Sequence, residues 1–71
     1  MCRSIKRLRG PEGVAADVEI DEAALQFVRK VSGFRAPSQR NAEAFEEAVR
    51  AVADASRRLL GSITARERAE P

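Results

Sequence analysis

The sequence predicts an all-α protein: a two-helix antiparallel hairpin with a basic N-terminal leader packing on it. Two stretches carry apolar residues at the three- and four-residue spacing typical of amphipathic helices, and a short segment containing glycine and proline separates them. The first sixteen residues lack this spacing. We therefore expect a single small helical domain over 1–63, with a leader at 1–16, helices at about 17–32 and 38–61, and a polar tail at 64–71.

The leader is basic and interrupted by residues that disfavour helix. Gly10 and Gly13 argue against one continuous helix. Ile5 and Leu8 are three residues apart, and we expect these two apolar groups to cover a neighbouring helix. The leader is thus predicted to pack on the hairpin as a short helical turn or as an extended segment.

The first helix is predicted from Asp17, a residue type that caps helix N-termini well, to the residue before Gly33. Glycine readily adopts the left-handed conformation that ends helices, and Phe34 is then expected to fold back onto Val28. The predicted buried stripe recurs at helical spacing. It consists of Ile20, Ala24, Leu25, Phe27, Val28 and Val31.

The second helix is predicted to begin at Ser38, with Asn41 as a competing N-cap, and to end at Gly61 or in a frayed turn that includes Ile63. Its apolar residues lie close to a heptad seam. They are Ala42, Phe45, Val49, Val52, Ser56, Leu59 and Ile63. An isolated hairpin buries such stripes poorly. We therefore expect either that the leader covers them or that two copies form a four-helix assembly.

Composition excludes several classes of site. The chain has one cysteine, Cys2, and no histidine, which rules out an internal disulfide framework and a self-contained Cys/His zinc site. No stretch has the roughly 20 apolar residues of a membrane span, and no apolar signal-peptide core follows the basic start. We expect a cytoplasmic protein with no metal, cofactor or membrane partner.

The run Ala-Ala-Leu-Gln-Phe-Val-Arg-Lys-Val-Ser-Gly-Phe at 23–34, together with the opening Met-Cys-Arg, resembles a family of small uncharacterised bacterial proteins, domain of unknown function twenty-two seventy-seven. The likeness covers roughly residues 1–63. Further matching positions are Pro37-Ser38, Asn41, Ala44-Phe45, Ala48-Val49 and Leu59-Leu60. The resemblance implies a bacterial intracellular protein. It implies no activity, cofactor or partner.

Cys2 is the first candidate site, because it is the only possible thiol nucleophile and Arg3, Lys6 and Arg7 could favour its thiolate form. The alternative is a small apolar residue tucked under the leader. The second candidate is the leader itself, where these cations and Arg9 could bind nucleic-acid phosphates. Nucleic acid is not favoured, because the leader has no interleaved aromatic residues for base stacking.

The third candidate is the turn between the helices. Lys30, Arg35 and Arg40 are expected to converge near the Ser38 hydroxyl, where a helix N-terminus could hold an anion. The favoured alternative is that Lys30 and Ser38 only cap the two helices.

No pattern of residues predicts an enzyme, since nothing places two carboxylates in a shared pocket. We expect a non-enzymatic protein-interaction or self-associating helical module whose partner is a second copy or another protein. The alternatives are a basic nucleic-acid-binding protein and a thiol-dependent or redox role for Cys2.

Overall fold

The computed structural model describes residues 7–10, 13, 14 and 16–69, and of 67–69 it describes the backbone alone. Two short strands precede a helix, a 3₁₀ turn and a longer helix. In chain order these elements are β1 (Arg9–Gly10), β2 (Gly13–Val14), α1 (Asp17–Ser32), η1 (Gln39–Asn41) and α2 (Ala42–Ala69). The prediction of a mostly helical protein is confirmed. The sequence did not predict the two-stranded sheet.

The two strands pair antiparallel, with Arg9 opposite Val14 and Gly10 opposite Gly13. Gly13 has a φ of 111°, which L side chains rarely adopt, so glycine suits this reversal of the chain. Leu8, just before β1, is half-buried and packs against the core, as predicted for the leader. The predicted contact of Ile5 lies outside the described residues.

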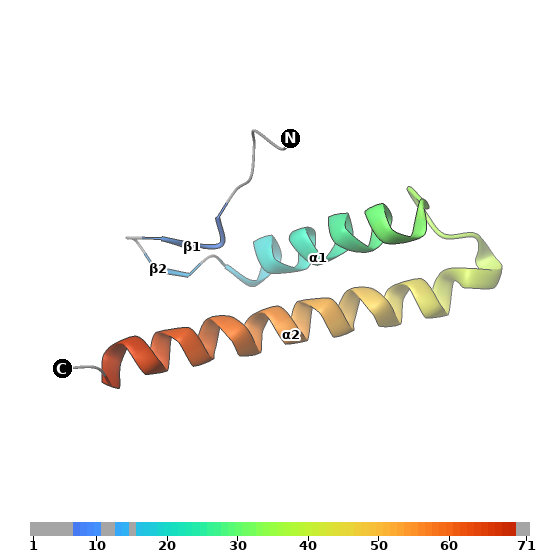
Figure 1. Ribbon diagram of the computed structural model, residues 1–71. Coiled ribbons are helices and arrows are strands. Elements are labelled where there is room, and N and C mark those ends of the chain that lie inside the picture. Colours follow the sequence, from blue (N-terminus) through green and yellow to red (C-terminus); the bar gives the residue numbers. More distant parts are fainter. Residues whose placement is uncertain (1–6, 11–12, 15, 70–71) are drawn as a thin grey trace.

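Helices α1 and α2 lie side by side and run in opposite directions (Figure 1). At 1.5 Å per residue, the 28 residues of α2 span about 42 Å and the 16 residues of α1 about 24 Å. Helix α2 therefore extends beyond the start of α1, on the side where the two strands lie (Figure 1).

The bounds of α1 agree with the prediction at both ends, but its start is built differently. Ala16 occupies the N-cap position and makes no side-chain cap, so Asp17 is the first helical residue and not the cap. The Asp17 carboxylate instead binds Arg57 of α2. Gly33 is left-handed, with a φ of 78°, and its N–H donates to the Arg29 carbonyl at 2.9 Å, as the C-terminal glycine was predicted to do.

The start of α2 differs from the prediction, because the helix begins at Ala42 after the 3₁₀ turn. The Ser38 hydroxyl makes no backbone cap. It accepts a hydrogen bond from Asn41 Nδ2 at 3.1 Å.

The predicted end of the second helix, at Gly61 or in a frayed turn with Ile63, is wrong, since α2 continues to Ala69. Residues 64–69 of the predicted tail are therefore helical. Gly61 lacks a positive φ and lies inside the helix. A helical glycine costs only about 1 kcal/mol relative to alanine. Ile63 and Thr64 are half-buried beyond it, and the Thr64 hydroxyl donates to the Leu60 carbonyl at 2.9 Å. The burial of Ile63 offsets the cost of the glycine, because covering an aliphatic side chain contributes a comparable amount.

The core between the helices is small. Its buried apolar residues are Ile20, Ala24, Val28, Phe45, Ala53 and Leu60. Alanine contributes two of the six, and alanine side chains bury little area. Three large members of the predicted stripes remain exposed: Phe27 at 53%, Val31 at 70% and Leu59 at 60%. The helix pair therefore covers only part of its apolar surface.

Candidate functional site

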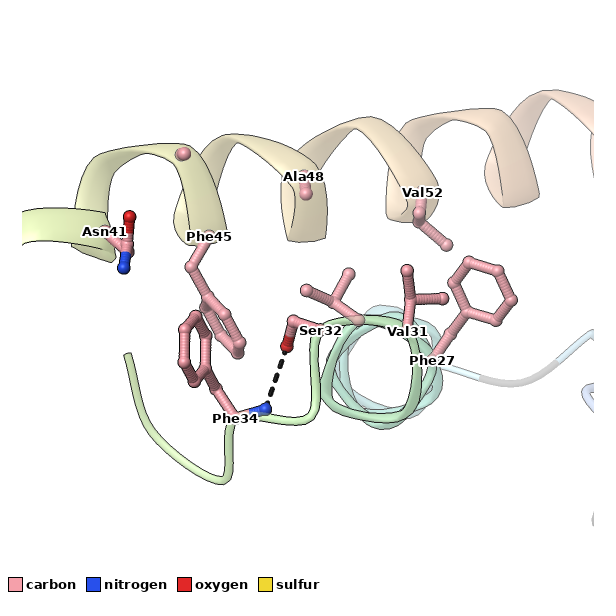
Figure 2. A pocket seen from close by; sticks show the side chains of 10 residues that line it. Phe27, Val31, Ser32, Phe34, Asn41, Phe45, Ala48 and Val52 are labelled. Atoms are coloured by element: carbon pink, nitrogen blue, oxygen red, sulfur yellow. Dashed lines mark hydrogen bonds between the residues drawn. The ribbon is translucent and has the colours of Figure 1, made fainter. Parts of the chain in front are cut away.

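An apolar groove of about 290 Å³ lies between the C-terminal half of α1 and the N-terminal half of α2. Side chains from both helices and from Phe34 in the turn face one another across it (Figure 2). The main contributors are Phe27, Val31, Phe34, Phe45, Ala48 and Val52. Ser32 and Asn41 are the only polar residues among the ten that line the groove, and none of the ten is charged. The groove therefore suits apolar side chains.

A local hydrogen bond helps to hold Phe34 at the end of the groove nearest the turn. The backbone N–H of Phe34 donates to the Ser32 hydroxyl at 3.1 Å (Figure 2). The Phe34 ring then points toward α2, where the Phe45 ring points back toward it. Val28, Phe34 and Phe45 line the same groove. The direct packing of Phe34 on Val28 stays a prediction.

The apolar surface continues along α2 beyond the groove. Ala44 and Ala55 are exposed, and Leu59 is exposed seven residues after Val52, which is two helical turns further on the same side. The charged residues of this part of α2 lie away from this apolar surface. Glu43, Arg50 and Asp54 are on the opposite side of the helix, whereas Glu47 and Arg58 border the apolar surface at one edge.

We define the open face as the exposed and half-exposed apolar residues on this uncharged side of the helix pair. Its members are Phe27 and Val31 of α1 and Ala44, Ala48, Val52, Ala55 and Leu59 of α2. Sequence periodicity had placed Phe27, Val31 and Leu59 in the buried stripes. Periodicity cannot give the position of α1 on α2. That position decides which apolar residues of each helix are covered and which stay exposed.

The opposite end of the helix pair is joined by Arg57, a contact that the sequence analysis missed. Its Nε donates to Asp17 Oδ1 at 3.0 Å, its Nη2 to Asp21 Oδ1 at 2.7 Å and its Nη1 to Asp54 Oδ1 at 3.3 Å. The hydrogen bonds with Asp17 and then Asp21 raise the pKa of the Arg57 guanidinium above its ordinary value. This cluster attaches the first turns of α1 to α2 and leaves Arg57 little capacity for a ligand.

The basic residues of the turn are only partly brought together. Lys30 and Arg35 border a shallow depression with Arg29, Gln26 and Gly33. Arg29 Nε donates to the Arg35 carbonyl at 2.8 Å, which uses part of the nearest guanidinium to hold the turn. Ser38 and Arg40 do not border this depression. The basic side chains therefore do not gather at the start of α2 as predicted. Arg29 and Lys30 lie in the last turn of α1, where cations complement the helix dipole.

The leader candidates fall mainly outside the described residues. Cys2, Arg3 and Lys6 lie there, while Arg7 and Arg9 are exposed. In the described part of the chain, no group of three or more His, Cys, Asp or Glu side chains is placed to hold a metal ion. None of the described helices combines the length and the apolar character that crossing a membrane requires.

Comparison with known proteins identifies the family. The model of the family described as "Uncharacterized conserved protein (DUF2277)" matches residues 1–71, so the chain belongs to this family. No curated protein and no solved structure matches the chain significantly. The open face is therefore interpreted on its own chemistry.

Proposed function

We propose that this member of the family is a non-enzymatic interaction module, a helical hairpin that pairs with a second copy of itself through the open face. The observation that carries the proposal is the exposure of Phe27, Val31 and Leu59 on one uncharged side of the molecule. Contiguous apolar surface of this kind is typical of protein–protein interaction sites. The setting we propose is the bacterial cytoplasm, where an unpaired cysteine such as Cys2 is stable.

A second copy is the occupant that the charges favour. A two-fold interface uses the same patch on both molecules, so that patch must be complementary to itself. The groove within the open face meets this condition, because none of its lining residues carries a charge to desolvate or repel. The alanines at 44, 48 and 55 would let another helix approach closely, and the larger side chains beside them would supply most of the buried area.

The energetics point to a reversible dimer. Covering a half-exposed Phe, Val or Leu gains about 1–2 kcal/mol. Three such residues in each of two copies therefore provide roughly 6–12 kcal/mol, against an association cost of about 4–15 kcal/mol. Close packing of the alanines adds to the gain. We expect a population of dimers that grows with protein concentration.

Sedimentation velocity over a concentration series tests the proposal. We expect the mass of the unmodified chain to rise from the 7.8 kDa monomer toward twice that value. The Leu59→Glu variant should remain monomeric, because dimerisation would desolvate its charge. Val18→Glu is the matched control, since Val18 is 63% exposed on α1 and does not line the groove.

Circular dichroism at low concentration should show the same helix content in all three proteins. A monomeric unmodified chain at millimolar concentration would contradict the proposal. Equal weakening by Leu59→Glu and Val18→Glu would contradict the choice of the open face.

A further inference from the structure

Two exposed residues of opposite charge flank the open face on the same edge of α2. Glu47 and Arg58 are eleven residues apart, which is about three helical turns, so their side chains leave the helix in nearly the same direction. Both are exposed, and neither forms an ion pair within the described residues. Arg57, next to Arg58, is by contrast bound to three aspartates.

We propose that the second copy binds with its α2 antiparallel to this α2, so that Glu47 of each copy pairs with Arg58 of the other. The inference rests on the proposed function and adds the orientation of the partner. A two-fold axis makes the contact reciprocal, so one dimer contains two such ion pairs. In a parallel two-fold arrangement the edges that carry Glu47 and Arg58 would lie on opposite sides of the interface, so neither ion pair could form.

The sizes of the facing side chains favour the same orientation. With the two-fold axis between Ala51 and Val52, Ala44 lies opposite Leu59 of the second copy, and Ala48 lies opposite Ala55. A large side chain then meets a small one, which lets the helices pack closely. In a parallel arrangement the two Leu59 side chains would meet each other while pairs of alanines left gaps.

The groove places α1 in the same interface. Phe27 and Val31 line it together with Ala48 and Val52, so a helix seated on these two α2 residues also contacts α1. The two-fold axis is perpendicular to the antiparallel α2 pair, so both α1 helices lie on the same side of that pair. The result is a four-helix assembly in which α2 packs beside the second α2 and α1 beside the second α1.

Cysteine cross-linking tests the orientation. Ala48→Cys and Ala55→Cys are made separately in a Cys2→Ser background, which leaves the introduced thiol as the only one in each chain. One protein is isotope-labelled so that mass spectrometry identifies each chain in a cross-linked product. Antiparallel pairing brings position 48 of one chain opposite position 55 of the other, so the two introduced thiols lie within the reach of a disulfide. Mild oxidation should cross-link the mixture into mixed dimers and leave each protein alone largely unlinked.

The other outcomes separate this inference from the proposed function. Cross-linking of each protein with itself would mean a parallel dimer, which overturns the orientation and leaves self-association through the open face standing. No cross-link in a dimer that Leu59→Glu disrupts would also overturn the orientation. A monomer at every concentration would overturn the proposed function and this inference with it.

Charge reversal provides an independent measurement. Glu47→Arg and Arg58→Glu should each raise the dissociation constant of the dimer about tenfold at low salt, because two ion pairs become like-charge contacts. The double reversal restores the pairs and should bring the constant back to within about threefold of the unmodified chain. Arg50→Glu is the matched control, since Arg50 lies away from the open face and should change the constant little. Failure of the double reversal to recover affinity would overturn the proposed pairing.

Discussion

The two sides of α2 present similar residues in different surroundings. Leu60 is 9% exposed and packs against α1, whereas its neighbour Leu59 is 60% exposed. Arg57 binds Asp17, Asp21 and Asp54, whereas its neighbour Arg58 has no ion pair within the described residues. The covered side accounts for the fold of one chain. The open side is as apolar as the covered side, but no second helix of the same chain packs on it. This difference is the reason to expect a partner there.

The largest effect expected from this comparison comes from truncating the two leucines. Leu60→Ala should lower the free energy of unfolding by about 2–4 kcal/mol, because it removes a buried side chain from a small core. Leu59→Ala should change the stability of the monomer by less than about 0.5 kcal/mol, since an exposed leucine contributes little and alanine favours helix. Urea unfolding followed by circular dichroism at low concentration measures both values.

The same two variants sharpen the comparison at high concentration. There Leu59→Ala should become destabilising, because the dimer that normally adds stability is weakened. If Leu59→Ala and Leu60→Ala were equally destabilising at low concentration, the difference between the two sides would not exist in solution.

An intermediate effect is expected from the two arginines. Arg57→Gln should lower the melting temperature by less than Leu60→Ala does, because it removes the contacts that hold the first turns of α1 on α2 and leaves Asp17 and Asp21 without their cation. The loss should shrink in high salt, which weakens these exposed interactions in the unmodified chain. Arg58→Gln should leave the melting temperature of the monomer nearly unchanged. Thermal unfolding of both variants at low and high salt gives the answer, and equal losses would contradict the assignment.

The smallest effect concerns Gly61, where α2 and its two sides extend beyond the end that the sequence predicted. Gly61→Ala should raise the free energy of unfolding by about 0.5–1 kcal/mol, because this glycine is helical and an added Cβ meets no atom within 4 Å. Gly33→Ala is the control of opposite sign, since Gly33 is left-handed and alanine is strained there. A loss of stability from Gly61→Ala would mean that the helix ends at Gly61 in solution.

The sequence predicted those parts of the fold that depend on local preferences. The apolar periodicity and the left-handed glycine at 33 determine α1 within the chain itself, and both of its bounds were predicted. The end of α2 was not predicted, because local preference at Gly61 is outweighed by the burial of Ile63 beyond it. The β pairing of Arg9 with Val14 has no alternating apolar signal, so it also escaped prediction.

The candidate site was harder to predict than the fold. Periodicity identified Phe27, Val31 and Leu59 as apolar stripe residues, but only the placement of α1 on α2 shows that they stay uncovered. The Arg57 cluster joins residues 40 and 36 positions apart, a distance at which sequence spacing carries no information. Asp17 shows why such contacts escape prediction. An aspartate at the start of a helix can cap the helix or form an ion pair, and the sequence does not distinguish the two roles.

The contact of Leu8 with the core has a consequence for biosynthesis. Leu8 packs against a cluster that includes Leu60, so the surface it needs is completed only when residue 60 has been made. On the ribosome the leader leaves the exit tunnel before that surface exists, although domains commonly fold from the N-terminal side during synthesis. Native packing of Leu8 is therefore expected to form only after residue 60 has left the ribosome.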